Sequence, residues 1–407
     1  MKDIGERNNM EEWKKIKISD IGRIVTGKTP RTSIKENYGG YIPFLTPSDD
    51  LSNKFAPITN KVLTDKGLME VRNCLLPENS ICVSCIGSDL GKVVMLKKPT
   101  VTNQQFNSII PNENYSPDFV YYLMIIVGKR LNFLSKTSTA VPIINKSTFS
   151  NFEVEVPSSL RNQTQIAKIL SSLDDKIELN NRINANLEEQ AQTLFRRWFV
   201  DFEFPNEQGL PYKSNGGAFI DSELGRIPKD WKVGNLFSIA TLFDSKRKPL
   251  SNIQRASRKG KYPYYGATSV MDYVDDYLFD DTFLLMGEDG SVVNEQGYPF
   301  LQYVTGKFWA NNHAHIMQGK NGVSTEMLYC MMKMTNISNL VTGAVQAKLS
   351  QTNMNKILFP LATKDILKYF SKMIEPLYAF LRKNVCENQT LIQQRDSLLP
   401  KLMNNEI

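Results

Sequence analysis

The clearest pattern along the chain is a stripe of mostly apolar residues that repeats at alternating steps of three and four. In the first of two distant segments, the stripe runs through Ile177, Asn180, Asn184, Leu187, Ala191, Leu194 and Trp198. In the second segment it runs through Leu377, Leu381, Asn384, Asn388, Leu391, Arg395, Leu398 and Leu402. This is the spacing of heptad a and d positions, so it predicts two long helices, each packed along a partner helix.

Each stripe contains two asparagines at positions where apolar side chains are usual. A buried Asn lowers the stability of a helix pair but fixes its register. We therefore expect the two helices to pair with each other within the chain, with Asn facing Asn. The alternative is two independent amphipathic helices, each lying on its own domain. Pro376 and Pro400 predict a kink or an end in the second helix, because proline removes a backbone donor.

Short β-branched segments bounded by Gly, Pro or Asn predict strands outside the two helices. They are 81–86, 91–96 and 151–156 in the first half, and 282–286 and 299–304 in the second half. Segments 119–127 and 325–334 each predict one further helix. The pattern therefore indicates mixed α/β domains, whose strand order it does not determine.

The two halves of the chain resemble each other at a constant offset. Ala140–Val141 recurs as Ala344–Val345 and Thr148 recurs as Thr352 (344 − 140 = 204; 352 − 148 = 204). The helical stripes keep the same offset. The chain is therefore expected to be a duplicated unit, each copy a mixed domain followed by a long helix. Between the copies, the Pro- and Gly-rich stretch 202–227 is expected to be a linker or surface loop.

Composition narrows the class of protein. Hydrophobic residues make up 41% of the 407 residues and charged residues 22%, as in soluble globular proteins. The longest apolar run, 119–127, has about half of the ~20 residues that a membrane span requires, and the polar N-terminus has no secretory signal pattern. Five cysteines are too few for a disulfide scaffold, so we expect a cytoplasmic protein. The formal charge of +7 permits a nucleic-acid partner.

The sequence offers little material for catalysis. The glycine-rich runs 87–91 and 287–290 do not lead clearly from a strand into a helix, so tight turns are expected there rather than nucleotide sites. Asp49, Asp50 and Lys54 match a nuclease carboxylate set only loosely. No enzyme signature is therefore predicted.

A zinc site is conceivable from the residue types alone. Cys82 and Cys85 with His313 and His315 are the residue types that zinc prefers. If 81–86 is a strand, however, the two thiols point to opposite faces of the sheet. Buried thiols and loop histidines are therefore the expected outcome, and no metal is predicted.

Basic and aromatic residues cluster in the second half of the chain. Between 244 and 261, seven cations stand against one acid, Asp244: Lys246, Arg247, Lys248, Arg255, Arg258, Lys259 and Lys261. Tyr262, Tyr264 and Tyr265 follow, and the run 271–296 carries eight acids and no Lys or Arg. A solvated loop is one interpretation. Phosphate contact by these cations, with packing by Tyr262, is the interpretation we favour.

Two finer expectations concern DNA contact. Arg255 or Arg258 is the expected base-reading residue of the second half, because the nearby tyrosines can pack the loop into a groove and hold an arginine in place. Lys28 and Arg31 belong to a weaker basic cluster in the first half, and they are its candidates for DNA contact.

Taken together, the chain resembles the DNA-sequence specificity subunits of type I restriction-modification enzymes over nearly its full length. The first half matches at 13–30 (WKKIKISDIGRIVTGKTP), 41–44 (YIPF), 76–81 (LPENSI), 139–157, 163–166 (QTQI) and 194–202 (LFRRWFVDF). The second half matches at 224–231 (LGRIPKDW), 311–315 (NNHAH) and 393–402. The order, duplication and spacing of these stretches carry the resemblance.

The resemblance implies an α+β fold. Two mixed α/β target recognition domains would be joined by two long antiparallel coiled-coil helices, with an internal pseudo-two-fold repeat. The expected segments are the first recognition domain at 1–158, the central helix at 159–200, a linker at 201–228, the second recognition domain at 229–361 and the C-terminal helix at 362–407.

The resemblance also implies a non-catalytic role in which each half reads one part of a bipartite, asymmetric DNA site. The implied partners are double-stranded DNA, two methyltransferase subunits and two restriction subunits, with no membrane. S-adenosylmethionine, ATP and magnesium would belong to those subunits, so no cofactor is expected in this chain. Two other classes stay open: a self-contained DNA methyltransferase or nuclease, and a coiled-coil scaffold without a DNA role.

Overall fold

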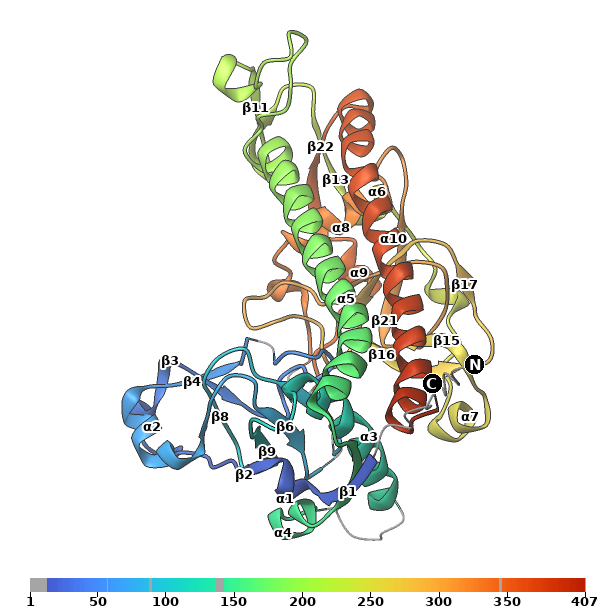
Figure 1. The fold of residues 1–407 in the computed structure, drawn as a ribbon. Coiled ribbons are helices and arrows are strands. Elements are labelled where there is room, and N and C mark those ends of the chain that lie inside the picture. Colours follow the sequence, from blue (N-terminus) through green and yellow to red (C-terminus); the bar gives the residue numbers. More distant parts are fainter. Residues whose placement is uncertain (1–12, 57, 88–89, 137–142, 344–345, 407) are drawn as a thin grey trace, which may run out of the picture. The chain divides into compact units, whose positions relative to one another are not determined.

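The computed structural model describes residues 13–56, 58–87, 90–136, 143–343 and 346–406 (Figure 1). The repeated pairs Ala140–Val141 and Ala344–Val345 lie outside the described residues. The chain divides into two compact units. Unit 1 is Met1–Leu179 with Glu387–Ile407, and unit 2 is Asn180–Cys386. The chain therefore passes from one unit to the other only inside its two long helices, α5 (Leu160–Phe195) and α10 (Lys364–Met403).

Unit 1 contains two four-stranded sheets and a strand pair. The first sheet has the order β2 (Gly22–Thr26), β9 (Phe106–Pro111), β6 (Ile81–Ser84), β7 (Val93–Met95). The second has the order β4 (Lys61–Leu63), β3 (Tyr38–Leu45), β8 (Thr100–Thr102), β5 (Leu75–Leu76). Strands β1 (Trp13–Lys17) and β10 (Glu153–Pro157) pair antiparallel. The helices are α1 (Ile18–Ile21), α2 (Asp65–Val71), α3 (Pro117–Lys136) and α4 (Lys146–Ser150).

Unit 2 repeats this topology strand for strand. Its first sheet has the order β14 (Ala240–Leu242), β21 (Ala314–Gly319), β18 (Phe283–Gly287), β19 (Leu301–Val304). Its second sheet has the order β16 (Val270–Val274), β15 (Lys259–Tyr265), β20 (Lys307–Ala310), β17 (Phe279–Asp280). The pair β13 (Lys232–Asn235) and β22 (Leu358–Leu361) corresponds to β1 and β10. The helices are α6 (Leu236–Ile239), α7 (Asn252–Ser257), α8 (Thr325–Lys333) and α9 (Gln351–Met354). Even the parallel pairing recurs, as β3 with β8 and β15 with β20.

The strand and helix segments predicted from local patterns are all present, with small shifts at their ends. The main difference is α3, which extends well beyond the predicted 119–127. In each unit one of these helices packs on a sheet: α3 contacts β6 and β7, and α8 contacts β18, β19 and β21. Their buried apolar residues form the main core of each unit, together with the parts of α5 and α10 that belong to it. Consequently the compact units do not end at 158 and 361, because each includes part of both long helices.

The long helices run antiparallel within each unit. In unit 2, the ring of Phe195 on α5 lies 5.9 Å from that of Phe370 on α10, and Asn384 donates a hydrogen bond to Asn184 at 2.9 Å. In unit 1, Arg395 on α10 lies 2.7 Å from Asp174 on α5. Every residue of the two stripes is buried or half-buried. The role of the asparagines in fixing register remains a prediction.

Neither proline ends the second helix, so that part of the prediction is wrong. Helix α10 continues through Pro376 and Pro400 to Met403. Pro376 is exposed and costs one backbone hydrogen bond, but Ile374, Tyr378 and Leu381 around it are buried in the core of unit 2. Pro400 lies in the last turn, where little helix follows. Among the described residues, no helix combines the length and apolar character needed to cross a membrane.

Candidate nucleic-acid interface

Three lysines of the predicted basic run are free to meet a ligand. Lys246 and Lys248 lie on the exposed turn after β14, and Lys261 lies on β15. Within the described residues none of them forms an ion pair, although Lys246 and Lys261 approach the rings of Phe243 and Tyr262 at 5.1 and 5.2 Å. Their charges are therefore available to phosphate. Tyr262 itself is half-buried against Tyr277.

Arg247, between two of these lysines, has a different environment from the one predicted. Its side chain is only 12% exposed. One guanidinium nitrogen donates to Glu288 at 2.6 Å and to the carbonyl oxygen of Ala314 at 2.7 Å, and the other lies 3.5 Å from Asp244. The charge of Arg247 is therefore already paired inside the protein, and its contact with phosphate stays a prediction.

The two arginines predicted to read a base are also engaged. Arg255 is 14% exposed, donates to the carbonyl oxygen of Leu250 at 2.7 Å and pairs with Asp272 at 3.4 Å. Arg258 pairs with Asp275 at 2.8 Å and covers the ring of Trp309 at 4.9 Å. Both arginines are therefore paired within unit 2, and the role of either as a base reader stays a prediction.

The pairing of β15 with β16 explains this outcome. The strands are antiparallel, so Lys259 lies opposite Val274 and the basic run faces the acidic run. Lys259 accordingly pairs with Asp272 at 2.5 Å, although its side chain is 60% exposed and stays accessible. Much of the basic run is therefore neutralised by acids that are distant in sequence.

The first-half candidates lie on the exposed loop after β2. Lys28 donates its backbone N–H to Thr102, and Arg31 donates its own to the carboxylate of Glu70 at 3.0 Å. The pKa of Glu70 is lowered chiefly by this backbone hydrogen bond. Neither basic side chain has an ion pair within the described residues. Both side chains are exposed, but the charges of Arg31 and Lys28 also act on the Glu70 carboxylate and help to lower its pKa.

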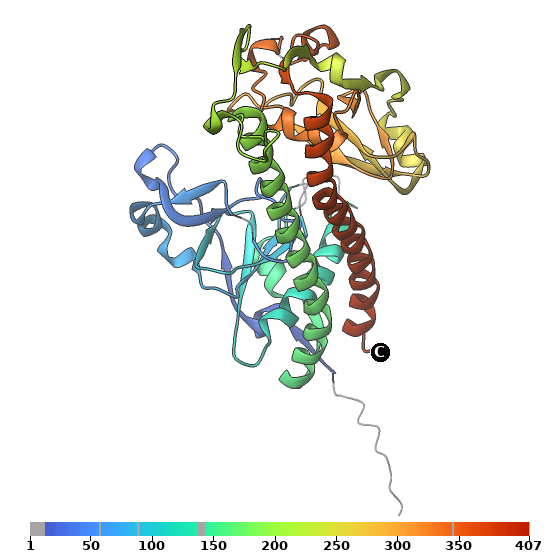
Figure 2. The ribbon, with the colours of Figure 1, turned by 90° about the horizontal axis from the view of Figure 1, so that it is seen from above.

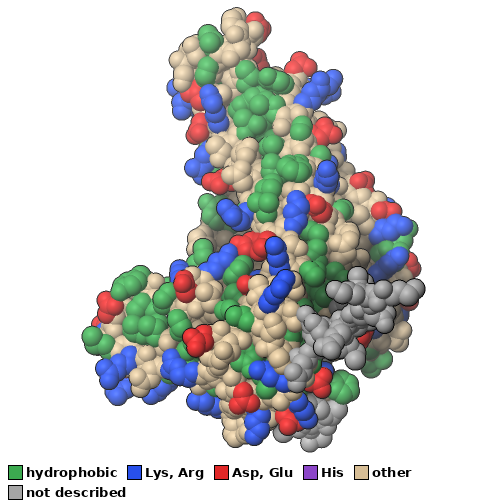
Figure 3. All heavy atoms as spheres, in the orientation of Figure 1, with side chains coloured by type: hydrophobic (Ala, Val, Ile, Leu, Met, Phe, Trp, Pro, Cys, Tyr) green, Lys and Arg blue, Asp and Glu red, His purple; other side chains and the backbone are tan. Residues whose placement is uncertain are grey.

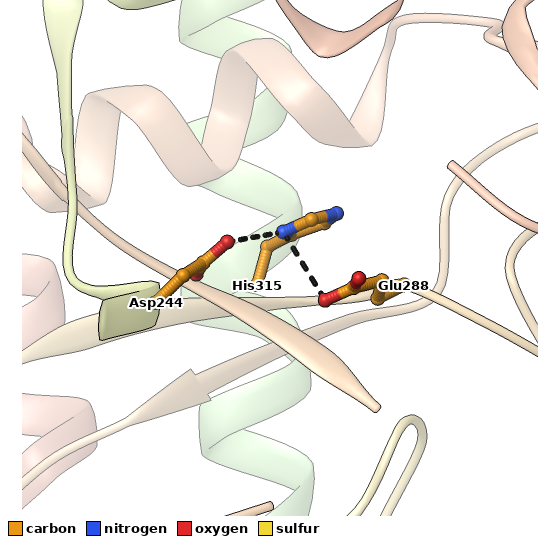
Figure 4. Close-up of side chains that lie close together, drawn as sticks. All are labelled: Asp244, Glu288 and His315. Atoms are coloured by element: carbon orange, nitrogen blue, oxygen red, sulfur yellow. Dashed lines mark hydrogen bonds and ion pairs between the residues drawn. The ribbon is translucent and has the colours of Figure 1, made fainter. Parts of the chain in front are cut away.

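A buried ionic cluster lies beneath the basic turn of unit 2 (Figure 4). His315 Nδ1 lies 2.6 Å from Asp244 and 3.6 Å from Glu288, and its Nε2 lies 2.8 Å from the carbonyl oxygen of Leu349. Asp244 also accepts the backbone N–H of Ile316 at 2.9 Å. The cluster, which includes Arg247, therefore anchors the turn that presents Lys246 and Lys248.

The same position in unit 1 is uncharged. Thr26 and Asn107 lie opposite each other in the β2–β9 pair and share a hydrogen bond of 2.7 Å. Asn107 also donates to the carbonyl oxygen of Ile144 at 3.0 Å. In the same way, the His315 ring contacts the carbonyl oxygen of Leu349 in unit 2. Sequence reasoning missed the cluster, and the signal that could have found it is the replacement of Asn107 by His315 between the two copies.

Asp244, Glu288 and His315 could in principle ligate a metal ion, since their ligand atoms lie within 4.8 Å of one another. The position of Arg247 argues against a metal site. The Arg247 guanidinium already contacts both carboxylates, so a cation there would meet a positive charge and compete for the same oxygens. We interpret the group as an ion-pair cluster.

Replacing Asp244 with Asn tests this cluster. Burial raises the pKa of Asp244, but its hydrogen bonds and the nearby charges of His315 and Arg247 outweigh burial and lower it below 3.8. The carboxylate therefore stabilises the fold above pH ~4, and this contribution is lost as the pH falls through the lower folded value. We expect Asp244→Asn to cost about 2–3 kcal/mol at pH 7 and to make stability less dependent on pH below ~4.

Urea unfolding at a series of pH values measures both effects. The control is Asp276→Asn, which alters an exposed carboxylate 3.9 Å from Arg258 and should cost less than about 1 kcal/mol. Equal losses in the two variants would contradict the anchoring role of Asp244.

The other chemical candidates do not come together. Cys82 and Cys85 belong to different hydrophobic clusters, and burial raises their pKa to about 12 and about 11, so both remain protonated thiols. Asp49 accepts the backbone N–H groups of Thr46 and Asn60, whereas Lys54 pairs with Asp118 at 2.6 Å. Gly290 has φ +74°, as in a tight turn, and Ser88 and Asp89 lie outside the described residues.

Comparison with known proteins agrees with the duplicated architecture. A sequence profile described as the type I restriction modification DNA specificity domain matches residues 10–189 and 228–385. The type I restriction enzyme MjaIX specificity subunit of Methanocaldococcus jannaschii is 28% identical over 98% of this chain and 94% of its own. The HindI specificity subunit of Haemophilus influenzae is 40% identical over 36% of this chain and 32% of its own.

A solved structure supports the fold. The crystal structure of a type I restriction-modification S subunit from M. genitalium superposes with a TM-score of 0.50 at 17% identity, covering 98% of this chain and 97% of that one. The chain thus belongs to the class of two-domain proteins with paired long helices. It is a member of the type I restriction-modification DNA specificity family. The predicted function as a DNA-specificity subunit is confirmed at this level, and such a subunit is non-catalytic.

Proposed function

We propose that each unit of this chain reads one part of a bipartite, asymmetric DNA site. The observation that carries the proposal is the duplication itself: two domains share one strand topology but carry different residues on their exposed turns. A repeated scaffold with unlike turns suits the reading of two unlike base sequences. Sequencing methylated adenines in cells that express the chain with its methyltransferase tests it. A motif of two unlike parts is expected, and the absence of any motif would contradict the proposal.

The chain would act in a larger, cytoplasmic assembly. It would recruit two methyltransferase subunits and, for cleavage, two restriction subunits. S-adenosylmethionine, ATP and magnesium would serve those subunits. This division of labour rests on the family to which the chain belongs. Its own contribution would be DNA recognition and the spacing of the two units.

Exposed cations would supply the contact with the DNA backbone. We expect Lys246→Gln, Lys248→Gln and Lys261→Gln together to weaken binding to all duplexes by a similar factor. If all three meet phosphates, the slope of log affinity against log salt falls by about 0.9 for each lysine, or ~2.7 in total. Fluorescence anisotropy with cognate and random duplexes at several salt concentrations measures both quantities.

A matched triple variant controls for net charge. Lys213→Gln, Lys229→Gln and Lys372→Gln remove three exposed charges from unit 2 outside the basic run. This variant should keep a salt slope near that of the unmodified chain. Equal slopes in all three proteins would show that the lysines of the basic run make no phosphate contact.

The two other classes make different predictions. A self-contained methyltransferase would transfer a methyl group to DNA when the isolated chain is given S-adenosylmethionine, and a self-contained nuclease would cut DNA when given magnesium. A scaffold without a DNA role would show no salt-dependent DNA binding, alone or with its methyltransferase. We expect neither result.

A further inference from the structure

The segment between α5 and β13 is more elaborate than a linker requires. It contains the hairpin of β11 (Phe219–Ser222) and β12 (Gly225–Pro228). It also has an aromatic core of its own: the ring of Phe204 stacks on those of Tyr212 and Trp231 at centroid distances of 4.6 and 5.1 Å. The sequence predicted a linker or surface loop here, and the structure instead shows a folded module, which we call the linker module (residues 201–231).

The linker module borders an open pocket of about 580 Å³ in unit 2. Its walls include the rings of Phe204, Tyr212, Trp231 and, from α10, Tyr369. Tyr369 is 53% exposed although it is aromatic. Figure 3 shows apolar side chains gathered on the surface between the end of α5 and the start of α10, with carboxylates at the edges. The volume lies within the range of about 300–1,000 Å³ that is usual for ligand pockets.

Three carboxylates complete the lining of this pocket: Glu207, Asp230 and Asp365. All three are exposed, and none forms an ion pair within the described part of the chain. No described Lys or Arg lines the pocket. Aromatic faces and unpaired carboxylates both attract cations, so both parts of the pocket lining favour a positively charged ligand.

The charge of the whole linker module agrees with that of the pocket. It has six acids and three bases, a net charge of −3, in a chain whose net charge is +7: Asp201, Glu203, Glu207, Asp221, Glu223 and Asp230 against Lys213, Arg226 and Lys229. Such a surface repels DNA phosphates. In Figures 1 and 2 the β11 hairpin also lies away from α7 and β15, which carry the basic run of the same unit. Its ligand is therefore a protein rather than the DNA.

We propose that this pocket is a docking site for an arginine or lysine side chain presented by a partner protein. The aromatic rings stack against the cationic group, and the carboxylates at the rim pair with it. Exposed Leu210 and Val200 of the same unit offer apolar contact to the residues beside that cation. The partner that we name, the methyltransferase subunit, rests on the function proposed above.

The test uses the whole 407-residue chain and the methyltransferase subunit of its own restriction-modification system. The pocket variant combines Glu207→Gln, Asp230→Asn and Asp365→Asn. The control variant combines Asp201→Asn, Asp221→Asn and Glu223→Gln, which make the same change of charge on exposed residues outside the pocket. Calorimetric titration gives the affinity of each protein for the methyltransferase at low and high salt, and urea unfolding with DNA binding by the isolated chain verifies that each is folded.

We expect the pocket variant to bind the methyltransferase at least tenfold more weakly at low salt, with much of its salt dependence lost, while the control changes less than twofold. Equal affinities of all three proteins would overturn the docking proposal, and so would equal losses in the two variants. In either case, a bipartite methylation motif in cells would leave the proposed function standing. An unmodified chain that neither binds the methyltransferase nor directs methylation would overturn both.

Discussion

Replacing Arg395 with Met should lower the free energy of unfolding of unit 1 by about 3–5 kcal/mol, because it leaves a buried carboxylate without its partner. Arg395 on α10 contacts Asp174 on α5 at 2.7 Å, and the Asp174 side chain is only 6% exposed. Tyr122 of α3 donates to the same carboxylate at 2.6 Å. Burial, with the nearby Asp174 charge, raises the pKa of Tyr122, so its hydroxyl stays a donor.

A double-mutant cycle separates this pair from simple packing. The double variant Asp174→Leu with Arg395→Met should recover most of the stability, since it removes both charges together. The control is Lys176→Met, which breaks an exposed pair with Glu387 between the same helices and should cost about 0–1 kcal/mol. Urea unfolding followed by circular dichroism measures all of these variants. If Arg395→Met lowered the free energy of unfolding as little as Lys176→Met, the buried Asp174 carboxylate would not need its arginine partner.

Inserting one heptad into both long helices should lengthen the unread spacer of the DNA site by about 3 base pairs. Seven helical residues add ~10.5 Å, and each base pair occupies ~3.4 Å. The insertion points are Leu179/Asn180 in α5 and Cys386/Glu387 in α10, where the chain passes from one unit to the other. A heptad there preserves the apolar stripe and interrupts no contact inside either unit.

The methylation motif of cells carrying the longer chain gives the spacer directly. The bases of the two half-sites should stay the same, because the units that would read them are unchanged. An insertion in α5 alone is the control, since it shifts one stripe against the other and should abolish methylation. An unchanged spacer in the double insertion would exclude the helices as the determinant of spacing.

The sequence alone determined the long helices, the repeat and the mixed α/β character of the domains. These features rest on local periodicity. The heptad stripe from Ile177 to Trp198 is a property of one segment, and its residues are buried or half-buried in the structure, as expected. Motif order, carried by stretches such as 163–166 and 224–231, identified the family. Pro376 does not end α10, because the packing of a long buried helix face outweighs the local effect of one proline.

Tertiary structure alone decided which charged side chains are available for binding. In the sequence, Arg247 and Lys248 are neighbours of the same type, yet one is neutralised by Glu288 and the other is open to solvent. The difference arises because strand pairing brings distant residues into contact with the basic run, as with Asp272, 13 positions from Lys259, and Glu288, 41 positions from Arg247. An ion pair depends on distances in space, which periodicity along the chain does not encode.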